Sequence, residues 1–281
     1  MCGPTASGKS ELSDALAERQ TELGASHVPT IVVDSMQVYK GLPVLTNQAR
    51  RRPAELVGIV PITERWTVAR HRECAERVVE NLPGTRFVLD AGTGMYLNAI
   101  LLDIPLSPRV SPELRRRAEE TVAQNEPNPR RAARARELEL AGAPERGSIW
   151  EAPLRYDATI VYLRPERSAL DANIAKRSAK IAHQGLREAE LVRRTLATGT
   201  PVNPSVLDSV GVKELLAHLS GDLTIHQAQD QINARTRQLA RRQVRWFDKL
   251  ARTLQGRATI RVLNQPEQMR DIHGMHDIIG A

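Results

Sequence analysis

The first ten residues carry a phosphate-binding pattern. Gly8, Lys9 and Ser10 close a segment that fits G-x-x-x-x-G-K-[ST] at every fixed position, and a stretch with helical periodicity follows it. In such a loop the backbone N–H groups point at phosphate oxygens, the next helix adds its positive end, and the lysine adds a point charge. The serine hydroxyl suits Mg²⁺. The pattern predicts a site for a diphosphate or a nucleoside triphosphate, formed by Gly3, Pro4, Thr5, Ala6, Ser7, Gly8, Lys9 and Ser10.

Two acidic residues stand at the ends of apolar, strand-like segments. Asp34 ends "TIVVD" and Asp90 ends "RFVLD". Ligands of doubly wound sheets bind beyond the carboxyl ends of the strands, so both carboxylates are candidates for the site. A carboxylate there can accept a proton as a general base, or it can hold the water shell of Mg²⁺. The two residues compete for the second role.

Strand-like segments at 30–34, 86–90, 158–163 and 259–263 alternate with helical ones, which predicts an α/β fold with a parallel sheet flanked by helices. With the loop, this is a P-loop NTPase-like sheet. The composition changes between residues 105 and 155, where prolines flank and separate two Arg/Glu-rich helical stretches, 111–124 and 129–141. We interpret this part as a helical insertion domain. The expected division is a first part of the core at 1–104, the insertion at 105–155, and a second part of the core at 156–281.

The start of the chain raises a structural question. A phosphate loop normally follows a central, buried strand, yet only Met1 and Cys2 precede Gly3. We expect that two residues cannot form that strand and that the sheet has a gap there. We also expect that the natural chain starts several residues earlier, or that residues before Met1 have been removed. Apolar residues placed before Met1 are then expected to raise both the melting temperature and the diphosphate affinity.

Composition limits the class of protein. The 281 residues carry 40 Lys and Arg against 33 Asp and Glu, a net charge of +7, which favours a polyanionic partner over a basic enzyme without one. Two cysteines exclude a disulfide framework and indicate a reducing cytoplasm. The apolar runs are of strand length, so we expect no contact with a membrane.

The segment 224–250 reads as a long helix with a basic face. Arg237, Arg241, Arg245 and Lys249 recur at a spacing of four residues, while Leu239, Trp246 and Leu250 mark another face. Periodicity alone favours a solvated charged face over a face that meets phosphate.

Five motifs in order give the chain a family resemblance. GPTASGKS, DSMQVYK, AGTGMYL, SVGVKELLAHLSGDLT and TRQLARRQVRWF, spread from residue 3 to about 250, resemble those of the tRNA dimethylallyltransferases, also called tRNA isopentenyltransferases. This family prenylates N6 of adenosine 37 beside the anticodon. The resemblance implies that the loop holds the diphosphate of dimethylallyl diphosphate, that the chain acts on the anticodon stem-loop of tRNA, and that it works as a monomer in the cytoplasm.

The resemblance also implies roles for particular residues. Thr5 and Arg177 would join Lys9 and a Ser10-held Mg²⁺ in neutralising the leaving diphosphate, and Asp34 would be the general base. "NPRRAARARELELAG" resembles the short Arg-rich stretch with which the family touches the anticodon stem. The residues implied to meet tRNA are Asp34, Ser35, Met36, Gln37, Arg130, Arg131, Arg134, Arg237, Arg241, Arg242, Gln243 and Trp246.

Several departures from the family pattern keep two alternatives open. Asp90 and Ala91 stand where the glycine turn of the family begins, and Val212 replaces a usual tyrosine. The run Leu45-Thr46-Asn47-Gln48 resembles a motif of enzymes that prenylate free adenine nucleotides, with Gln48 in place of its lysine. An adenylate dimethylallyltransferase is therefore the first alternative, and a P-loop ATPase or kinase acting with RNA is the second.

Overall fold

Four short parallel strands form the sheet of this α/β protein. The computed structural model describes residues 1–24, 27–82, 86–106, 110–122, 126, 129–143 and 148–265. Strand β1 (Thr30–Val33) pairs in parallel with β2 (Val88–Ala91), and β3 (Thr159–Leu163) pairs in parallel with β4 (Thr259–Leu263). All four lie within one or two residues of the segments that the sequence predicts.

The first two residues join the two strand pairs. Cys2 forms parallel bridges to Ala91 of β2 and to Tyr162 of β3. Its N–H donates to the carbonyl of Val161, and its carbonyl accepts from Leu163, both at 2.9 Å. The amino group of Met1 donates to Leu89 at 2.9 Å. The prediction of a gap in the sheet is thus wrong, because Cys2 lies between β2 and β3 and the spatial order is β1, β2, Cys2, β3, β4. The effect of an extension before Met1 stays a prediction.

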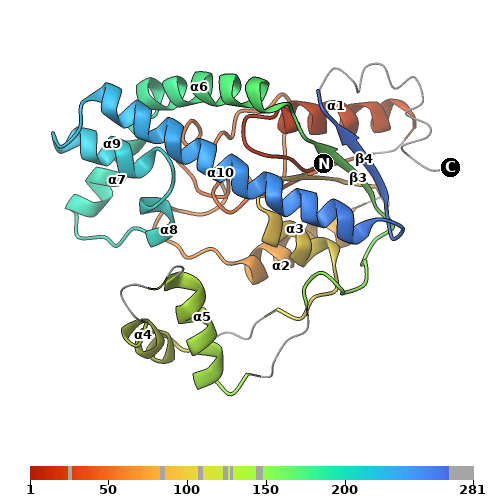
Figure 1. Ribbon diagram of the computed structural model, residues 1–281, viewed down its shortest axis with the longest axis horizontal. Coiled ribbons are helices and arrows are strands. Elements are labelled where there is room, and N and C mark those ends of the chain that lie inside the picture. The colour runs from red at the N-terminus through yellow and green to blue at the C-terminus, as the bar shows by residue number, and fades with distance from the viewer. Residues whose placement is uncertain are drawn as a thin grey trace.

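Helices cover both faces of the sheet (Figure 1). Helix α1 (Lys9–Glu22) packs on one face, where its Leu12 and Ala17 join Val161 and Leu163 in a buried cluster. The opposite face is covered by α2 (Val68–Glu80), α3 (Gly94–Leu101) and the second half of α10 (Ile225–Leu254). No helix in the described ranges is long and apolar enough to cross a lipid bilayer.

Helix α10 is the longest element of the described residues and contributes side chains to the two largest hydrophobic clusters. Thr224 caps its first turn by accepting from the Gln227 N–H, and the Gln227 side chain accepts from the Thr224 N–H. Phe247 and Leu250 of its second half pack under the sheet, whereas Ala228 and Ile232 of its first half enter a second core. The other helices around that second core, or beside it, are α6 (Arg167–Gln184), α7 (Leu186–Ala197), α8 (Pro204–Leu207) and α9 (Val212–Leu219).

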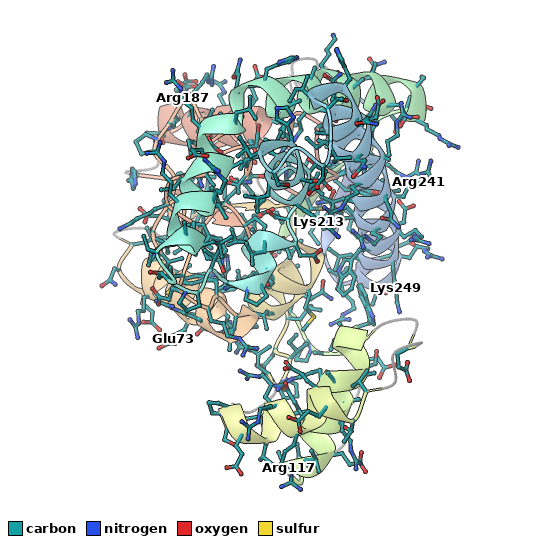
Figure 2. All side chains as sticks on the ribbon, turned by 90° about the vertical axis from the view of Figure 1, so that its left-hand side faces the viewer. Glu73, Arg117, Arg187, Lys213, Arg241 and Lys249 are labelled. Carbon is teal, nitrogen blue, oxygen red and sulfur yellow. The ribbon has the colours of Figure 1, made fainter. Side chains whose placement is uncertain are left out.

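Two helices stand apart from the sheet. Helices α4 (Pro112–Glu120) and α5 (Pro129–Leu140) pack on each other and lie away from the other helices in Figures 1 and 2. The chain leaves and re-enters the core side by side, because Leu102 and Leu154 form an antiparallel bridge and the Asp103 N–H donates to the Pro153 carbonyl. The two expected helical stretches are therefore present.

Candidate functional site

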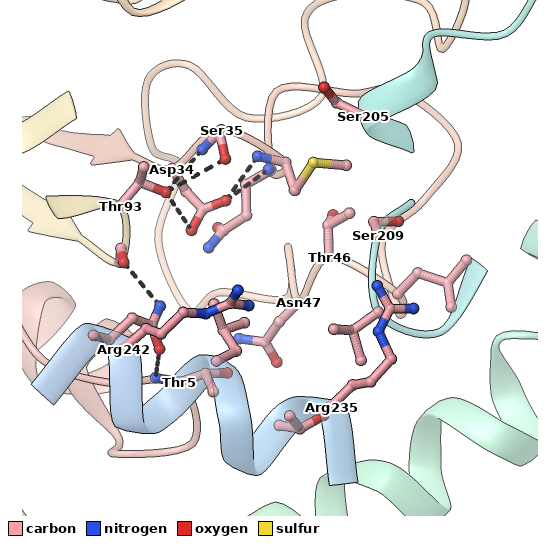
Figure 3. Close-up of a pocket in the computed structure, with 18 of the residues that line it drawn as sticks. Thr5, Asp34, Ser35, Thr46, Asn47, Thr93, Ser205, Ser209, Arg235 and Arg242 are labelled. Atoms are coloured by element: carbon pink, nitrogen blue, oxygen red, sulfur yellow. Dashed lines mark hydrogen bonds between the residues drawn. The ribbon is translucent and has the colours of Figure 1, made fainter. Parts of the chain in front are cut away.

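A cavity of about 730 Å³ opens beside the carboxyl ends of β1 and β2. Its wall comes from the phosphate loop, the segments that follow β1 and β2, and helices α6 and α10 (Figure 3). Ten of the residues named from the sequence line it: Thr5, Lys9, Asp34, Ser35, Met36, Gln37, Arg177, Arg242, Gln243 and Trp246. These residues come from four separate stretches of the chain, so folding brings the predicted site together.

The phosphate loop has the shape that its glycines predict. Gly8 has a left-handed backbone at φ 86° and is the N-cap of α1, which aims the start of that helix at the loop. A Cβ at Gly3 would lie 2.7 Å from the carbonyl oxygen of Leu163, so only glycine lets the loop pass this close to β3. Thr5, Ser7 and Lys9 are buried, and Lys9 and Thr5 face the cavity.

The Asp34 carboxylate is held in place through one of its own two oxygens. Its Oδ1 accepts from the N–H groups of Met36 at 2.8 Å and Gln37 at 3.3 Å. Among the described residues, its Oδ2 accepts a hydrogen bond only from the Thr93 hydroxyl, at 3.5 Å, and it lies beside Gly92 at the cavity wall. Two backbone N–H groups fix the carboxylate, while the second oxygen keeps lone pairs for a ligand.

Three cations face this carboxylate or the loop. The end of the Lys9 side chain and the Oδ2 atom of Asp34 both lie beside the Cα of Gly92, on the side that a Cβ would occupy. The Arg177 guanidinium is half-buried in α6, where burial lowers its pKa and the charge of Asp34 partly offsets that shift. Arg242 and Thr5 lie across the cavity from Asp34 (Figure 3). Lysine and arginine around one cavity suit a multiply charged anion.

Gln243 links α10 to the phosphate loop. Its Oε1 accepts from the Thr5 N–H and its Nε2 donates to the Gly92 carbonyl, both at 2.8 Å. One amide therefore holds the loop and the turn after β2 at a fixed separation. The sequence places Gln243 among the residues that meet tRNA, but here both of its polar groups bind protein.

An aromatic wall closes another side of the cavity. Trp66 and Tyr96 line it, and both contact the buried His71, with ring centroids 5.8 and 5.0 Å apart respectively. The Trp66 indole N–H donates to Nδ1 of His71 at 3.0 Å. Burial lowers the pKa of His71 to about 4, so the ring is neutral at pH 7 and can accept this bond.

A buried charge cluster lies behind the loop. The Arg50 guanidinium binds Asp14 of α1 at 2.8 Å and Asp90 of β2 at 2.6 Å, and all three side chains are at most 4% exposed. Burial by itself would raise the pKa of Asp90, but the charges of Lys9 and Arg50 and hydrogen bonding outweigh it and hold that pKa below its ordinary value. Asp90 does not line the cavity. Sequence reasoning missed Arg50 because no local pattern ties it to residues 36 and 40 positions away.

Other residues expected to meet tRNA lie on the outer surface of α10, at its contacts with the rest of the core, and on α5. Arg241 and Arg245 are exposed on α10, and Arg241 projects outward together with Lys249 in Figure 2. Arg237 lies 3.5 Å from Asp171 of α6, while Trp246 packs on Gly94 and Trp150 and donates to Asn98 at 3.1 Å. In α5, Arg134 pairs with Glu137, and the side chains of Arg130 and Arg131 lie outside the described part of the structure.

Comparison with known proteins adds independent findings. A family model described as IPP transferase matches residues 37–250. A tRNA dimethylallyltransferase of Rubrobacter xylanophilus is 57% identical over 284 residues, which cover 100% of this chain and 97% of that protein. The tRNA dimethylallyltransferase 1 of Citrifermentans bemidjiense is 34% identical over 275 residues, 88% of this chain and 87% of that protein.

Solved structures show the same fold. A structure described as a eukaryotic dimethylallyltransferase acting on tRNA superposes with a TM-score of 0.75 at 22% identity, covering 99% of this chain and 76% of that one. The tRNA isopentenylpyrophosphate transferase of Bacillus halodurans superposes with a TM-score of 0.66 at 24% identity, covering 99% and 91%.

Proposed function

The chain belongs to the IPP transferase family, and from this premise we propose that it transfers the dimethylallyl group of dimethylallyl diphosphate to N6 of adenosine 37 in tRNA. The observation that carries the proposal is the shared cavity, in which an anion-binding loop, three arginines and a fixed carboxylate meet. The loop between Cys2 and α1, with its left-handed Gly8, supports a P-loop NTPase-like core.

The reaction needs stabilisation of a leaving diphosphate. As the allylic C–O bond breaks, negative charge grows on the diphosphate and positive charge spreads over the five-carbon fragment. Lys9, Arg177, Thr5 and the loop N–H groups are placed to receive that negative charge. The Thr5 N–H already binds Gln243, so we assign Thr5 its contribution through the hydroxyl.

Asp34 is the proposed general base. The lone pair of the adenine amine is delocalised into the ring, so the amine must lose a proton as it attacks. Oδ2 of Asp34 faces the cavity, where it can accept a hydrogen bond from N6–H and then the proton. Its Oδ1 stays bound to two backbone N–H groups, which keeps the carboxylate in position throughout.

The residues at the loop fit Mg²⁺. No cluster of three His, Cys, Asp or Glu side chains that could hold a metal occurs among the described residues, so a cation here would depend on the Ser10 hydroxyl and on the substrate. Oxygen ligands from one hydroxyl and a diphosphate suit this ion. When bound, Mg²⁺ would neutralise part of the leaving-group charge.

The tRNA side is assigned to α10 and to the insertion. Arg241, Arg242 and Arg245 are exposed on α10, where Arg242 also lines the cavity, and α5 carries Arg130, Arg131 and Arg134. Adenosine 37 must leave its stack to reach Asp34, and a single-stranded loop allows this at low cost. The paired exit and return of the chain at residues 102 and 154 supports an insertion at 105–155 between core parts 1–104 and 156–281. We propose that the chain acts as a monomer, and a tRNA substrate supports a cytoplasmic location.

One assay decides between the acceptors. Labelled dimethylallyl diphosphate is incubated with the protein and either an A36-A37 anticodon stem-loop or AMP. We expect transfer to the stem-loop and little to AMP. Efficient prenylation of AMP without transfer to the stem-loop would show an adenylate dimethylallyltransferase. Release of phosphate from ATP without prenyl transfer would show the ATPase or kinase alternative.

A further inference from the structure

We propose that Asp90 is a positioning residue that orients the Ser10 hydroxyl toward the Mg²⁺ of the diphosphate site, and that Arg50 fixes Asp90 for this task. The inference rests on the proposed function, because that function places a metal-bound diphosphate at the loop. It gives a role to the most deeply buried charge cluster of the described structure, which the general-base chemistry of Asp34 does not use.

The two oxygens of Asp90 have different surroundings. Oδ2 accepts from Nη1 of Arg50 at 2.6 Å. Oδ1 is buried and has no hydrogen bond of normal geometry to any residue that the structure describes. Ser10 is tied to the same cluster, because its backbone carbonyl accepts from Nη2 of Arg50 at 3.5 Å. Its hydroxyl adds to the effects of Lys9 and Arg50 that lower the pKa of Asp90. A buried oxygen without a partner is costly, so a donor is expected to turn toward it.

We assign Ser10 as that donor. A hydroxyl has one hydrogen to donate and two lone pairs to offer. If the hydrogen of Ser10 points at Asp90 Oδ1, both lone pairs point away from the carboxylate and remain available to a cation at the loop. The hydrogen bond also makes the Ser10 oxygen more electron-rich, as hydrogen-bonded partners do for metal ligands in general.

Arg50 makes this arrangement rigid. Besides Asp90, its guanidinium binds Asp14 of α1 and lies 3.5 Å from the backbone carbonyl of Ser10. One side chain thus joins β2, α1 and the loop residue itself. Since Arg50 occupies Oδ2, only Oδ1 can turn toward the loop.

Two other roles for Asp90 fit less well. A general base must reach the substrate, but Asp90 is 1% exposed and does not line the cavity. A direct metal ligand needs the cation at the carboxylate itself, and the same burial keeps a hydrated ion away. Action through Ser10 requires no access to solvent.

The test measures metal dependence without turnover. The affinity of the full chain for inorganic pyrophosphate is measured by calorimetry at saturating Mg²⁺ and again in EDTA, and the ratio of the two affinities is the metal enhancement. For Asp90→Asn we expect the enhancement to fall about 10-fold to 100-fold, the usual loss when the partner of a metal ligand is removed. The affinity in EDTA should stay within about twofold, because Asn leaves Lys9 and the loop in place. Asp14→Asn is the matched control, since it removes the other buried carboxylate from Arg50 without touching Ser10, and its enhancement should match the wild type.

A double variant shows whether Asp90 acts through Ser10. Asp90→Asn should cause no further loss of enhancement in a Ser10→Ala background, because the hydroxyl it orients is gone. An unchanged enhancement in Asp90→Asn, an equal loss in EDTA, or a full additional loss beside Ser10→Ala would each overturn the proposal. Should Asp90→Asn not fold, Asp90→Glu keeps the charge but moves the oxygens, and the same loss is expected. These results are separable from the proposed function, which fails only if the wild type does not prenylate tRNA.

Discussion

At the scale of single residues, the two oxygens of Asp34 have different roles, and these roles determine how a substitution of Asp34 affects fold and turnover. Oδ1 holds the turn after β1 through the N–H groups of Met36 and Gln37, and an asparagine oxygen can accept the same two bonds. Oδ2 is the oxygen left for chemistry.

We therefore predict that Asp34→Asn keeps the fold and the binding of dimethylallyl diphosphate while lowering kcat by roughly 10²-fold or more, within the ~10²–10⁴ typical of general bases. Steady-state kinetics with a tRNA stem-loop and calorimetry with the diphosphate measure the two effects. Lys9→Ala serves as the contrasting variant, since it should weaken diphosphate binding as well as turnover. A near-normal kcat in Asp34→Asn would place the base elsewhere.

At the scale of elements, α10 and the phosphate loop are joined by one amide. Gln243→Leu removes the partners of the Thr5 N–H and the Gly92 carbonyl, two groups that must then find water or remain unpaired. We predict a KM for dimethylallyl diphosphate raised by about tenfold, on the order of 1–1.5 kcal/mol.

The control for this variant lies on the same helix. Gln231→Leu replaces an exposed glutamine of α10 far from the loop, and its KM should equal that of the wild type. Equal KM values for all three proteins would show that the link between α10 and the loop does not support substrate binding.

Helix α2 carries a pH dependence through His71. The pKa of His71 falls from its ordinary value of 6.5 to about 4 in the folded protein, so below pH 6.5 the unfolded chain binds a proton that the folded chain does not. The free energy of unfolding should decrease by about 3 kcal/mol from this group as the pH falls from 6.5 to 4, and not further below 4. Denaturant unfolding of the wild type and His71→Phe at several pH values measures the difference. The variant should be less stable at pH 7, since the Trp66 indole loses its acceptor, but its stability should fall less with acid. Parallel pH profiles would contradict the argument.

How much the sequence could predict depends on how far apart along the chain the interacting residues lie. The strands, the basic helix and the two insertion helices were predicted because hydrophobic periodicity is local. Asp34 and Lys9 were placed correctly at one site because parallel strands end at a common edge. The bonds of Gln243 to Thr5 and Gly92 span 238 and 151 positions, and no local pattern encodes them. The two-residue central strand was missed for a related reason: Cys2 is strand-like only through its partners on both sides.

At the scale of the whole molecule, exposed arginines lie along α10, and one of them, Arg242, lines the cavity. Arg241 lies on this helix, whereas Arg187 of α7 lies on a different part of the surface (Figure 2). Arg237 is the weaker choice for a test, because Asp171 already faces it at 3.5 Å.

We predict that the double reversal Arg241→Glu and Arg245→Glu weakens tRNA binding at all salt concentrations and lowers the slope of log affinity against log salt by about 2, one for each lost phosphate contact. Filter binding or anisotropy with an anticodon stem-loop measures both quantities. Diphosphate binding should not change, because the loop and Arg177 serve it. The control is Lys180→Glu with Arg187→Glu, which changes the net charge equally. If both double variants lose the same affinity, the effect comes from net charge and not from the α10 surface.

The bridge between Leu102 and Leu154, where the chain leaves and re-enters the core, affects the entropy that is lost when the chain folds. Because the two ends of the insertion are held side by side by core residues, the core must close a loop there whatever the loop contains. The cost of closing a flexible loop grows only with the logarithm of its length, about 0.6 kcal/mol for each doubling. The stability of the core therefore depends little on how many residues lie between these two points. The insertion can vary in length to match the RNA that we propose it contacts.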